Sequence, residues 1–233
     1  MSRALILLSL PLVNACAAQV AGDAPFLSQA GPASEYRVPV VSWEERRFAG
    51  VVQQKFDFSC GSAALATLLR HHYGYEVRED NAFRGMWAAG DRAQIRQVGF
   101  SLLDMKRWLA TRGLAADGYK VSLDDIQKTG IPGLALIMVE NYRHFVVVKG
   151  VRGNEVLVGD PSRGLTVMSR GAFLAAWNGV YFVLSGEQAI GRDAFGRAEQ
   201  WAAFTRAPVG NRFSDPVSQQ ALMLSAPFYG DIG

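Results

Sequence analysis

The stretch that decides the fold runs from residue 54 to residue 69 and reads QKFDFSCGSAALATLL. Its first half is polar and prone to turn, whereas its second half is rich in Ala and Leu, which favour helix. We therefore expect a helix to begin at Cys60 and to run to about His72, where Gly74 stops it. At a helix start, unpaired N–H groups and the helix dipole favour a thiolate over a thiol. The sequence predicts a reactive cysteine at position 60.

The only other cysteine, Cys16, lies in a segment with the features of a secretory signal peptide. One positive charge precedes a short apolar run, and small residues follow, which predicts a signal peptide over residues 1–18. The run is too short to cross a bilayer and no later stretch is long enough, so we expect no transmembrane span. Residues 13–16 also resemble a lipoprotein box with a lipid tether at Cys16, although Asn14 fits that box poorly. Signal cleavage would leave Cys60 without a disulfide partner outside the cytoplasm, which favours a reactive role for its thiol.

Composition indicates a globular chain with one main domain. Hydrophobic residues make up 49% of the 233 residues and charged residues 19%, which suits a folded core. A net charge of +3 without a basic run gives no sign of nucleic-acid binding. We divide the chain into a linker or N-terminal extension over 19–46, the main domain over 47–185, and a C-terminal extension over 186–233 that packs over the domain or trails from it.

The order of the expected elements indicates an α+β fold. After a short strand at 38–42, we expect the Cys60 helix and further helices at 81–89, 101–113 and 122–130, with a loop through Gly99. Runs rich in Val, Ile, Leu and Met then predict strands at 133–140, 145–151, 155–159, 165–169 and 180–184, with one helix at 172–177. Helices followed by strands of one antiparallel sheet are typical of α+β domains.

A reactive thiolate needs a base within hydrogen-bonding reach, and the three histidines can be compared directly. His71 and His72 lie at the far end of the helix that begins at Cys60, roughly 16 Å along its axis, so they cannot reach the sulfur. His144 remains, at the start of a predicted strand. Taken alone, it reads more readily as a histidine on a sheet without a catalytic role. The presence of Cys60 and the absence of a competing base favour the catalytic interpretation.

The group that orients the base is expected on the next strand. Asp160 follows His144 by sixteen residues, and a hairpin with its pivot near residue 152 places position 144 opposite position 160. The alternative is that Asp160 and Pro161 form an ordinary turn at the end of a strand. The symmetry of the hairpin register favours a contact between the side chains of His144 and Asp160.

The developing oxyanion requires hydrogen-bond donors. The backbone N–H of Cys60 is one, and a side-chain amide from Gln54 or its neighbour Gln53 is the second. The residues alone separate these two glutamines only weakly. Asp57 is expected to serve a turn or a helix cap. Three dispersed histidines and one cysteine do not give the spacing of metal ligands, so we expect no metal and no cofactor.

Three motifs together resemble those of the cysteine peptidases that trim double-glycine leaders from bacteriocin precursors: Gln-(five residues)-Cys-Gly-x-Ala-x-Leu, His-Phe-Val-Val-Val, and Asp-Pro sixteen residues after the histidine. The resemblance covers roughly residues 50–185. It implies a papain-like fold, with a nucleophile helix packed on an antiparallel sheet. It also implies a Cys60–His144–Asp160 triad, with Gln54 rather than Gln53 at the oxyanion hole. Family members are usually fused to an ABC transporter and face the cytoplasm, whereas this chain has a predicted export signal and no transporter segment.

The chain is more closely similar to stand-alone, secreted peptidases that serve functional-amyloid export. The likeness rests on the stretch around Cys60 and on GFSLLDMK (99–106), WNG (177–179), DPVS (215–218) and LM (222–223). It implies a periplasmic peptidase of an amyloid and biofilm secretion system. The implied partner is a protein or peptide substrate, such as an amyloid subunit or an outer-membrane secretion component.

Two alternatives use the same residues differently. An amide hydrolase of the NlpC type also relies on Cys and His, but it predicts an Asp-Cys-Ser-Gly elbow, which Ser59-Cys60-Gly61 does not supply. A non-catalytic binding or chaperone module of the same pathway would be indicated by loss of the cysteine or histidine. Both are present.

Overall fold

The computed structural model describes residues 24–25, 37–38, 40–56, 58–140 and 142–204. The chain divides into two compact units between Arg46 and Arg47. In the first unit, β1 (Ala24–Pro25) pairs antiparallel with β2 (Arg37–Val38). Of the strand expected over 38–42, residue 38 lies in β2, whereas residues 40–42 form neither helix nor strand; α1 (Trp43–Phe48) follows. The predicted signal peptide, Cys16, Asp57 and the tail motifs lie outside the described residues.

Four helices open the second unit: α2 (Cys60–Tyr73), α3 (Glu79–Ala89), α4 (Arg92–Val98) and α5 (Leu102–Thr111). The predicted limits of α2 are confirmed, because Gly74 ends the helix in the left-handed conformation with φ 72°. A capping box between Ser101 and Asp104 starts α5, as expected. The loop predicted through Gly99 is wrong, because Asp91 accepts hydrogen bonds from two backbone N–H groups and caps α4.

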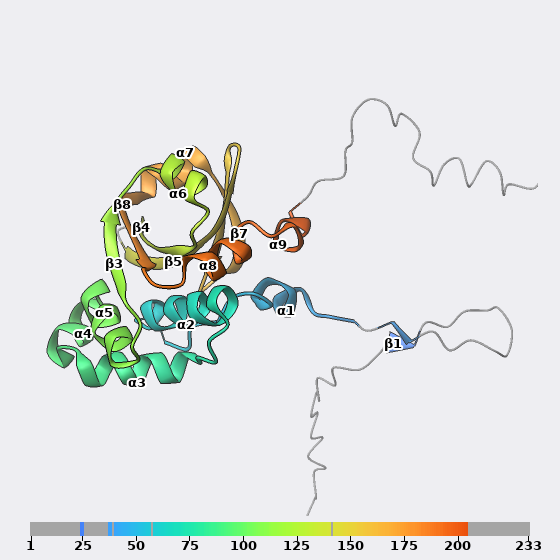
Figure 1. The fold of residues 1–233 in the computed structure, drawn as a ribbon. Coiled ribbons are helices and arrows are strands. Elements are labelled where there is room, and N and C mark those ends of the chain that lie inside the picture. The colour runs from blue at the N-terminus through green and yellow to red at the C-terminus, as the bar shows by residue number, and fades with distance from the viewer. Residues whose placement is uncertain (1–23, 26–36, 39, 57, 141, 205–233) are drawn as a thin grey trace, which may run out of the picture. The chain divides into compact units, whose positions relative to one another are not determined.

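A six-stranded antiparallel sheet follows, in the order β3-β8-β4-β5-β6-β7 (Figure 1). Its strands are β3 (Ala116–Lys120), β4 (Gly133–Val139), β5 (Tyr142–Arg152), β6 (Glu155–Asp160), β7 (Gly164–Ser169) and β8 (Trp177–Leu184). Two short helices, α6 (Leu123–Thr129) and α7 (Arg170–Ala176), interrupt the strand sequence. The α+β prediction is confirmed. Edge strand β3 was missed because ADGYK has neither a β-branched run nor an alternating apolar pattern.

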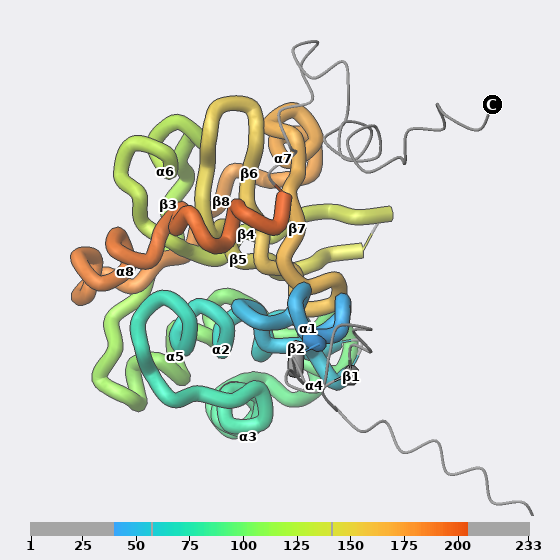
Figure 2. The backbone as a smooth tube through the Cα atoms, turned by 90° about the vertical axis from the view of Figure 1, so that its right-hand side faces the viewer, coloured from blue at the N-terminus to red at the C-terminus, as the bar shows by residue number. Residues whose placement is uncertain are grey.

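Both faces of the sheet are buried, and β5 shows why. Phe145 and Val147 point into a core shared with α2, α3 and α5, whereas Val146 and Val148 belong to a second core beneath α6 and α7. Figure 2 shows α2 and α5 on one side of the sheet and α6 and α7 on the other. A strand that buries alternate residues on two apolar faces reads as a continuous hydrophobic run, which is how residues 145–148 appear in the sequence.

Two further helices, α8 (Gln188–Ala194) and α9 (Ala198–Ala202), lie in the stretch assigned from sequence to a C-terminal extension. α8 packs against α2 at close range, because a Cβ on Gly191 would lie 2.7 Å from the hydroxyl of Tyr73. Trp201 of α9 is buried. Among the described residues, no helix combines the length and apolar character needed to cross a bilayer.

Candidate active site

Cys60 is the first residue of α2 and is only 6% exposed. The start of α2 packs closely against the region around α5, since a Cβ on Gly61 would lie 2.9 Å from Met105 and 3.2 Å from Phe100. Glycine at position 61 is therefore what lets the helix begin this close to α5. The side chain of Ser59 does not cap the helix but donates to Glu79 at 2.5 Å. Cys60 is thus held at a helix N-terminus, as the sequence predicted.

His144 and Asp160 form a buried pair. His144 Nε2 lies 2.8 Å from Asp160 Oδ1, and both residues are 6% exposed. Cys60 lies close enough to His144 to help raise the pKa of its imidazole. Because Asp160 occupies Nε2, the ring nitrogen left for the thiol is Nδ1. The structure thereby brings together three residues separated by as many as a hundred positions in the sequence.

The charges of this pair stabilise each other. Burial alone lowers the pKa of His144, but hydrogen bonds to Asp160 and Cys60 outweigh it and raise the pKa from 6.5 to about 9. Burial alone raises the pKa of Asp160, but the hydrogen bond and charge of His144, with hydrogen bonds from Ser162, lower it from 3.8 to about 2. An imidazolium beside a carboxylate is therefore the resting state at neutral pH.

A β-bulge determines that His144 and Asp160 share a face of the sheet. Arg152 pairs with Glu155, but at the other end of the ladder Val147 pairs with Gly159, because one residue of β5 is left over between Val148 and Gly150. The extra residue is Lys149. An uninterrupted ladder would place Val147 opposite Asp160 and turn the carboxylate to the opposite face from His144.

The register expected from sequence is wrong in detail. The pivot of the hairpin lies at Gly153-Asn154 rather than near residue 152, and Asp160 is a diagonal neighbour of His144 rather than its direct partner. The predicted contact nevertheless forms, because the one-residue bulge compensates for the shifted pivot and restores the common face.

Gln54 lies beside this pair. It lines a pocket of about 330 Å³ together with His144, Asp160, Ser162 and Arg163, whereas Gln53 is exposed and is not among the lining residues. The backbone N–H of Gln54 donates to the carbonyl of Pro161 at 2.9 Å, directly after β6. Its Nε2 donates to the carbonyl of Phe56 at 3.1 Å, and its Oε1 is buried without a partner. The Gln54 side chain is therefore held at the pocket, where its amide N–H can exchange the bond to Phe56 for one to another acceptor.

The other two histidines lie at the far end of α2, as predicted. Burial and the nearby charge of Lys149 lower the pKa of His71 to about 4 and that of His72 well below 6.5. Both are therefore neutral at pH 7. In the part of the chain that the structure describes, no group of three or more His, Cys, Asp or Glu side chains forms a metal site.

Two residues that shape the candidate active site, Ser162 and Lys149, were not predicted from the sequence. Ser162 donates both its backbone N–H and its hydroxyl to Asp160, at 2.8 and 2.7 Å. An Asp-Pro-Ser turn is a recognisable signal for such bonds. Lys149 is the other, and nothing in the run VVVKGV marks it as the bulged residue except the glycine that follows it.

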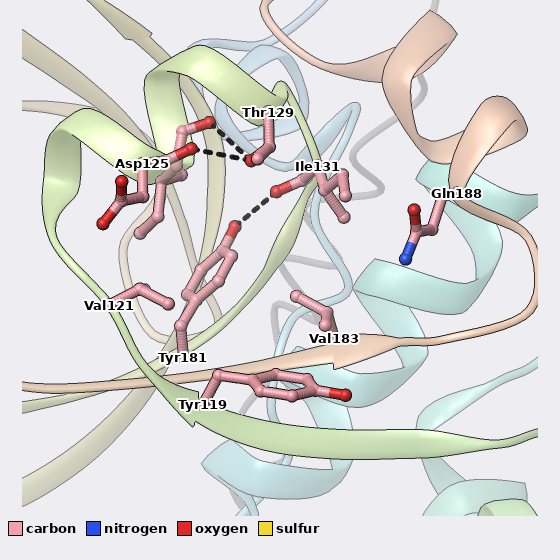
Figure 3. Close-up of a pocket in the computed structure, with 9 residues that line it drawn as sticks. Tyr119, Val121, Asp125, Thr129, Ile131, Tyr181, Val183 and Gln188 are labelled. Atoms are coloured by element: carbon pink, nitrogen blue, oxygen red, sulfur yellow. Dashed lines mark hydrogen bonds between the residues drawn. The ribbon is translucent and has the colours of Figure 1, made fainter.

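A second pocket, of about 190 Å³, lies between α6, β3 and β8 (Figure 3). Its wall is mostly apolar, and Tyr181 donates its hydroxyl to the carbonyl of Ile131 at 2.8 Å. None of the residues that line it is a cysteine or a histidine. His144 therefore lines the first pocket and not the second, and Cys60 is not among the residues that line either of these two pockets.

A cysteine at a helix start, with a histidine on an antiparallel sheet that is hydrogen-bonded to a carboxylate, is the arrangement of papain-like cysteine peptidases. The chain belongs to the peptidase C39 family, whose model matches residues 49–189. The expected family resemblance is thus confirmed. The solved peptidase domain of Streptococcus ComA, described as a bi-functional ABC transporter involved in quorum sensing, is similar in fold. It has a TM-score of 0.50 and 22% identity, covering 58% of this chain and 97% of that domain.

Two relatives show how the similarity is distributed. The chain is 46% identical over 148 residues to the "Probable functional amyloid protease FapD" of Pseudomonas fluorescens. That match covers 64% of this chain and 66% of the relative, which is just under two thirds of its length. The chain is also 27% identical over 133 residues to LagD of Lactococcus lactis, a lactococcin-G-processing and transport ATP-binding protein, covering 56% of this chain and 18% of LagD.

Proposed function

We propose that this protein is a cysteine endopeptidase in which Cys60 is the nucleophile, His144 the base, Asp160 the orienting carboxylate and Gln54 an oxyanion donor. The single observation that carries the proposal is the buried pair of His144 and Asp160, 2.8 Å apart, with Cys60 close enough to help raise the pKa of His144. A thiol, an imidazole and a carboxylate in that order supply a nucleophile, a proton carrier and a group that fixes the imidazole.

The chemistry follows from the charges. The Cys60 sulfur, as a thiolate beside the His144 imidazolium, attacks the scissile carbonyl carbon and forms a tetrahedral oxyanion. His144 then donates its proton to the leaving amine, and the C–N bond breaks to give a thioester. Water, losing a proton to His144, attacks the thioester and releases the acid, which regenerates Cys60. Asp160 remains ionised throughout, since its pKa is about 2.

The oxyanion is stabilised by two donors. The backbone N–H of Cys60 has no helical partner because it begins α2. Gln54 Nε2 exchanges its bond to the Phe56 carbonyl for one to the oxyanion. That exchange makes the contribution of Gln54 specific to the transition state.

An exposed aromatic surface beside Cys60 supports a protein or peptide substrate over a small amide. Phe56 is 55% exposed and Phe58 42% exposed, and the two rings stack 6.0 Å apart. Phe83 contacts both rings and stacks on Trp87. An apolar surface of this kind next to a nucleophile suits apolar side chains of a polypeptide better than a polar sugar amide.

The substrate we propose is a protein of a functional-amyloid secretion system, either an amyloid subunit or an outer-membrane secretion component, cut in the periplasm. Support comes from the 46% identity to a relative named as a functional amyloid protease. The apolar segment over residues 4–13, with small residues after it, supports export by a signal peptide. A role in biofilm formation follows if the fibres depend on the cut.

The deciding experiment compares a strain lacking the gene with strains that carry the wild-type gene, Cys60→Ala or Gln54→Ala. We expect both variants to accumulate normally and to lose surface fibres, with an uncut partner protein visible by mass spectrometry. His71→Ala is the matched control and keeps wild-type fibres, because His71 lies at the far end of α2. Persistence of fibres and of the cut in the Cys60→Ala strain contradicts the peptidase proposal.

A further inference from the structure

Lys149 is an unusual residue for the centre of a fold. It is the extra residue at the bulge of β5, and its exposed fraction is 0%. Lysine is rarely buried so deeply, because removing an ammonium from water costs free energy unless the charge is paired. Among the described residues, Lys149 takes part in none of the ion pairs. Its presence at this position therefore calls for an explanation other than stability.

The amino group of Lys149 contacts two elements. Nζ donates to the carbonyl of Gly50 at 3.0 Å and lies 3.0 Å from Nε2 of His72. Because His72 is neutral, its Nε2 can accept a hydrogen bond from the ammonium. The stem of Lys149 passes over Gly159, where a Cβ would lie 3.0 Å from Lys149 Cδ. Gly159 directly precedes Asp160, so one side chain contacts the strand of the carboxylate and the approach to Gln54.

Residues 50–55, here called the Gln54 segment, form neither helix nor strand and are held by separate hydrogen bonds. Val52 N–H donates to Thr67 Oγ1 at 2.8 Å, and Lys55 N–H donates to Glu79 Oε1 at 3.0 Å. Between them, Gln54 N–H donates to Pro161. The bond from Lys149 to Gly50 is the anchor at the upstream end, and it comes from the strand that carries His144.

We propose that Lys149 is a positioning residue: it fixes the Gln54 segment through Gly50 and ties it to the strand pair that carries His144 and Asp160. The effects on kcat that we expect from this inference rest on the proposed peptidase function. The geometry of the oxyanion donor relative to the triad then depends on this buried amino group as well as on the bond from Gln54 to Pro161. A displacement of Gln54 by a fraction of a hydrogen-bond length is sufficient to weaken its contribution to the transition state.

The charge of Lys149 makes its hold on the Gln54 segment depend on pH. Burial, with a smaller contribution from Arg197, lowers the pKa of Lys149 from 10.5 to about 7. The charged or titratable groups that face it are His71 and His72 of α2 and Arg197, and of these neither histidine is charged near pH 7. An ammonium makes a stronger bond to the Gly50 carbonyl than an amine does. The Gln54 segment is therefore held more tightly below pH 7 than above it.

The test replaces Lys149 by Met, which retains the length and apolar stem of the side chain and removes the donor. We expect kcat to fall by roughly tenfold with KM changed less than about twofold, because a positioning loss affects the transition state. The melting temperature is expected to change little, because removal of a buried charge offsets the loss of the bonds to Gly50 and His72. Lys128→Met, an exposed lysine on α6, is the matched control and leaves kcat unchanged.

Two readouts separate positioning from a general structural role. In a Gln54→Ala background, Lys149→Met is expected to cost less than about twofold, because its effect acts through Gln54. Amide hydrogen exchange by mass spectrometry is expected to accelerate in residues 50–55 and to stay unchanged in α5 and β8. If no substrate is cleaved by the wild type and the local acceleration is still seen, the peptidase proposal fails and the positioning of the Gln54 segment stands.

The wild-type protein supplies a further measurement that needs no variant and holds if Lys149→Met does not fold. Its kcat is expected to decline by roughly threefold as pH rises through about 7. This decline lies well below the pH of about 9 at which His144 loses its proton. The proposal is overturned by a flat profile from pH 5 to pH 8, or by unchanged exchange in residues 50–55 of Lys149→Met. Equal losses from Lys149→Met with and without Gln54 also overturn it.

Discussion

Ser162 donates twice to the same oxygen of Asp160 that holds His144: its backbone N–H lies 2.8 Å and its hydroxyl 2.7 Å from Oδ1. The N–H of Arg163 adds a third donor at 3.2 Å. Asp160 thus meets His144 from a fixed position, in a turn built by the residues that follow it.

That relationship predicts the effect of Ser162→Ala. Removal of the hydroxyl takes away one of the groups that lower the pKa of Asp160 and leaves the backbone donors in place. We expect kcat to fall by about three- to tenfold with little change in KM, because the imidazole is held less firmly. Steady-state kinetics against the cleaved partner measures this. Ser122→Ala, which removes a helix cap at α6, is the control for loss of a serine.

The pairing of Cys60 with His144 predicts unusual thiol reactivity at low pH. His144 remains an imidazolium up to about pH 9, and its charge favours the thiolate beside it. Iodoacetamide is therefore expected to alkylate native protein at pH 6 at a rate close to that at pH 8. His144→Ala should restore the steep rise with pH of an ordinary thiol. Equal pH dependence in the two proteins would show that the histidine does not activate the sulfur.

Replacement of the base and of its partner should have graded effects. His144→Ala is expected to abolish cleavage, whereas Asp160→Asn leaves weak activity, because the carboxylate orients the imidazole without accepting its proton. Burst kinetics with an ester substrate would locate the loss in the acylation step. A fully active His144→Ala protein refutes the assignment of the base.

Gln54→Ala tests the oxyanion donor. We expect turnover to decrease on the order of a hundredfold, with KM and stability little changed, since the amide acts on the tetrahedral intermediate. Gln53→Ala is the matched neighbour and remains active, because Gln53 is exposed. A large increase in KM with unchanged kcat would instead assign Gln54 to ground-state substrate binding.

The His144–Asp160 pair also predicts how stability varies with pH. The raised pKa of His144 contributes stability that is complete below pH 6.5 and is lost as pH rises through about 9. The lowered pKa of Asp160 contributes stability that is complete above pH 3.8 and is lost as pH falls through about 2. Urea unfolding of wild type and Asp160→Asn should therefore differ most between about pH 4 and pH 6.5. A difference that grows above pH 9 would contradict this coupling.

Much of the fold was predictable because local signals and the global pattern agree. Ser101 with Asp104 and Ser122 with Asp125 marked two helix starts, Gly74 marked a helix end, and apolar runs marked five strands of the sheet. These features act within a few residues, so a single sequence displays them. Strand β3 is recruited by pairing with β8, which its own residues do not reveal.

The candidate site was predictable as a set of residues but less so as a geometry. Elimination among three histidines indicated His144, and spacing indicated Asp160. The bulge at Lys149 depends on how both strands pack on two cores at once, which no local pattern encodes. The predicted contact formed through a register different from the expected one.

The packing of α8 and α9 has a practical consequence for anyone who shortens this protein to the residues that match the family, 49–189. A chain ending at residue 189 would be cut inside α8 and would uncover Tyr73 at the end of the nucleophile helix. It would also lose Trp201 and the N–H of Gly196, which donates to the carbonyl of Lys149 at the bulge. A fragment that keeps these contacts therefore extends through residue 202, past the boundary that sequence similarity alone suggests.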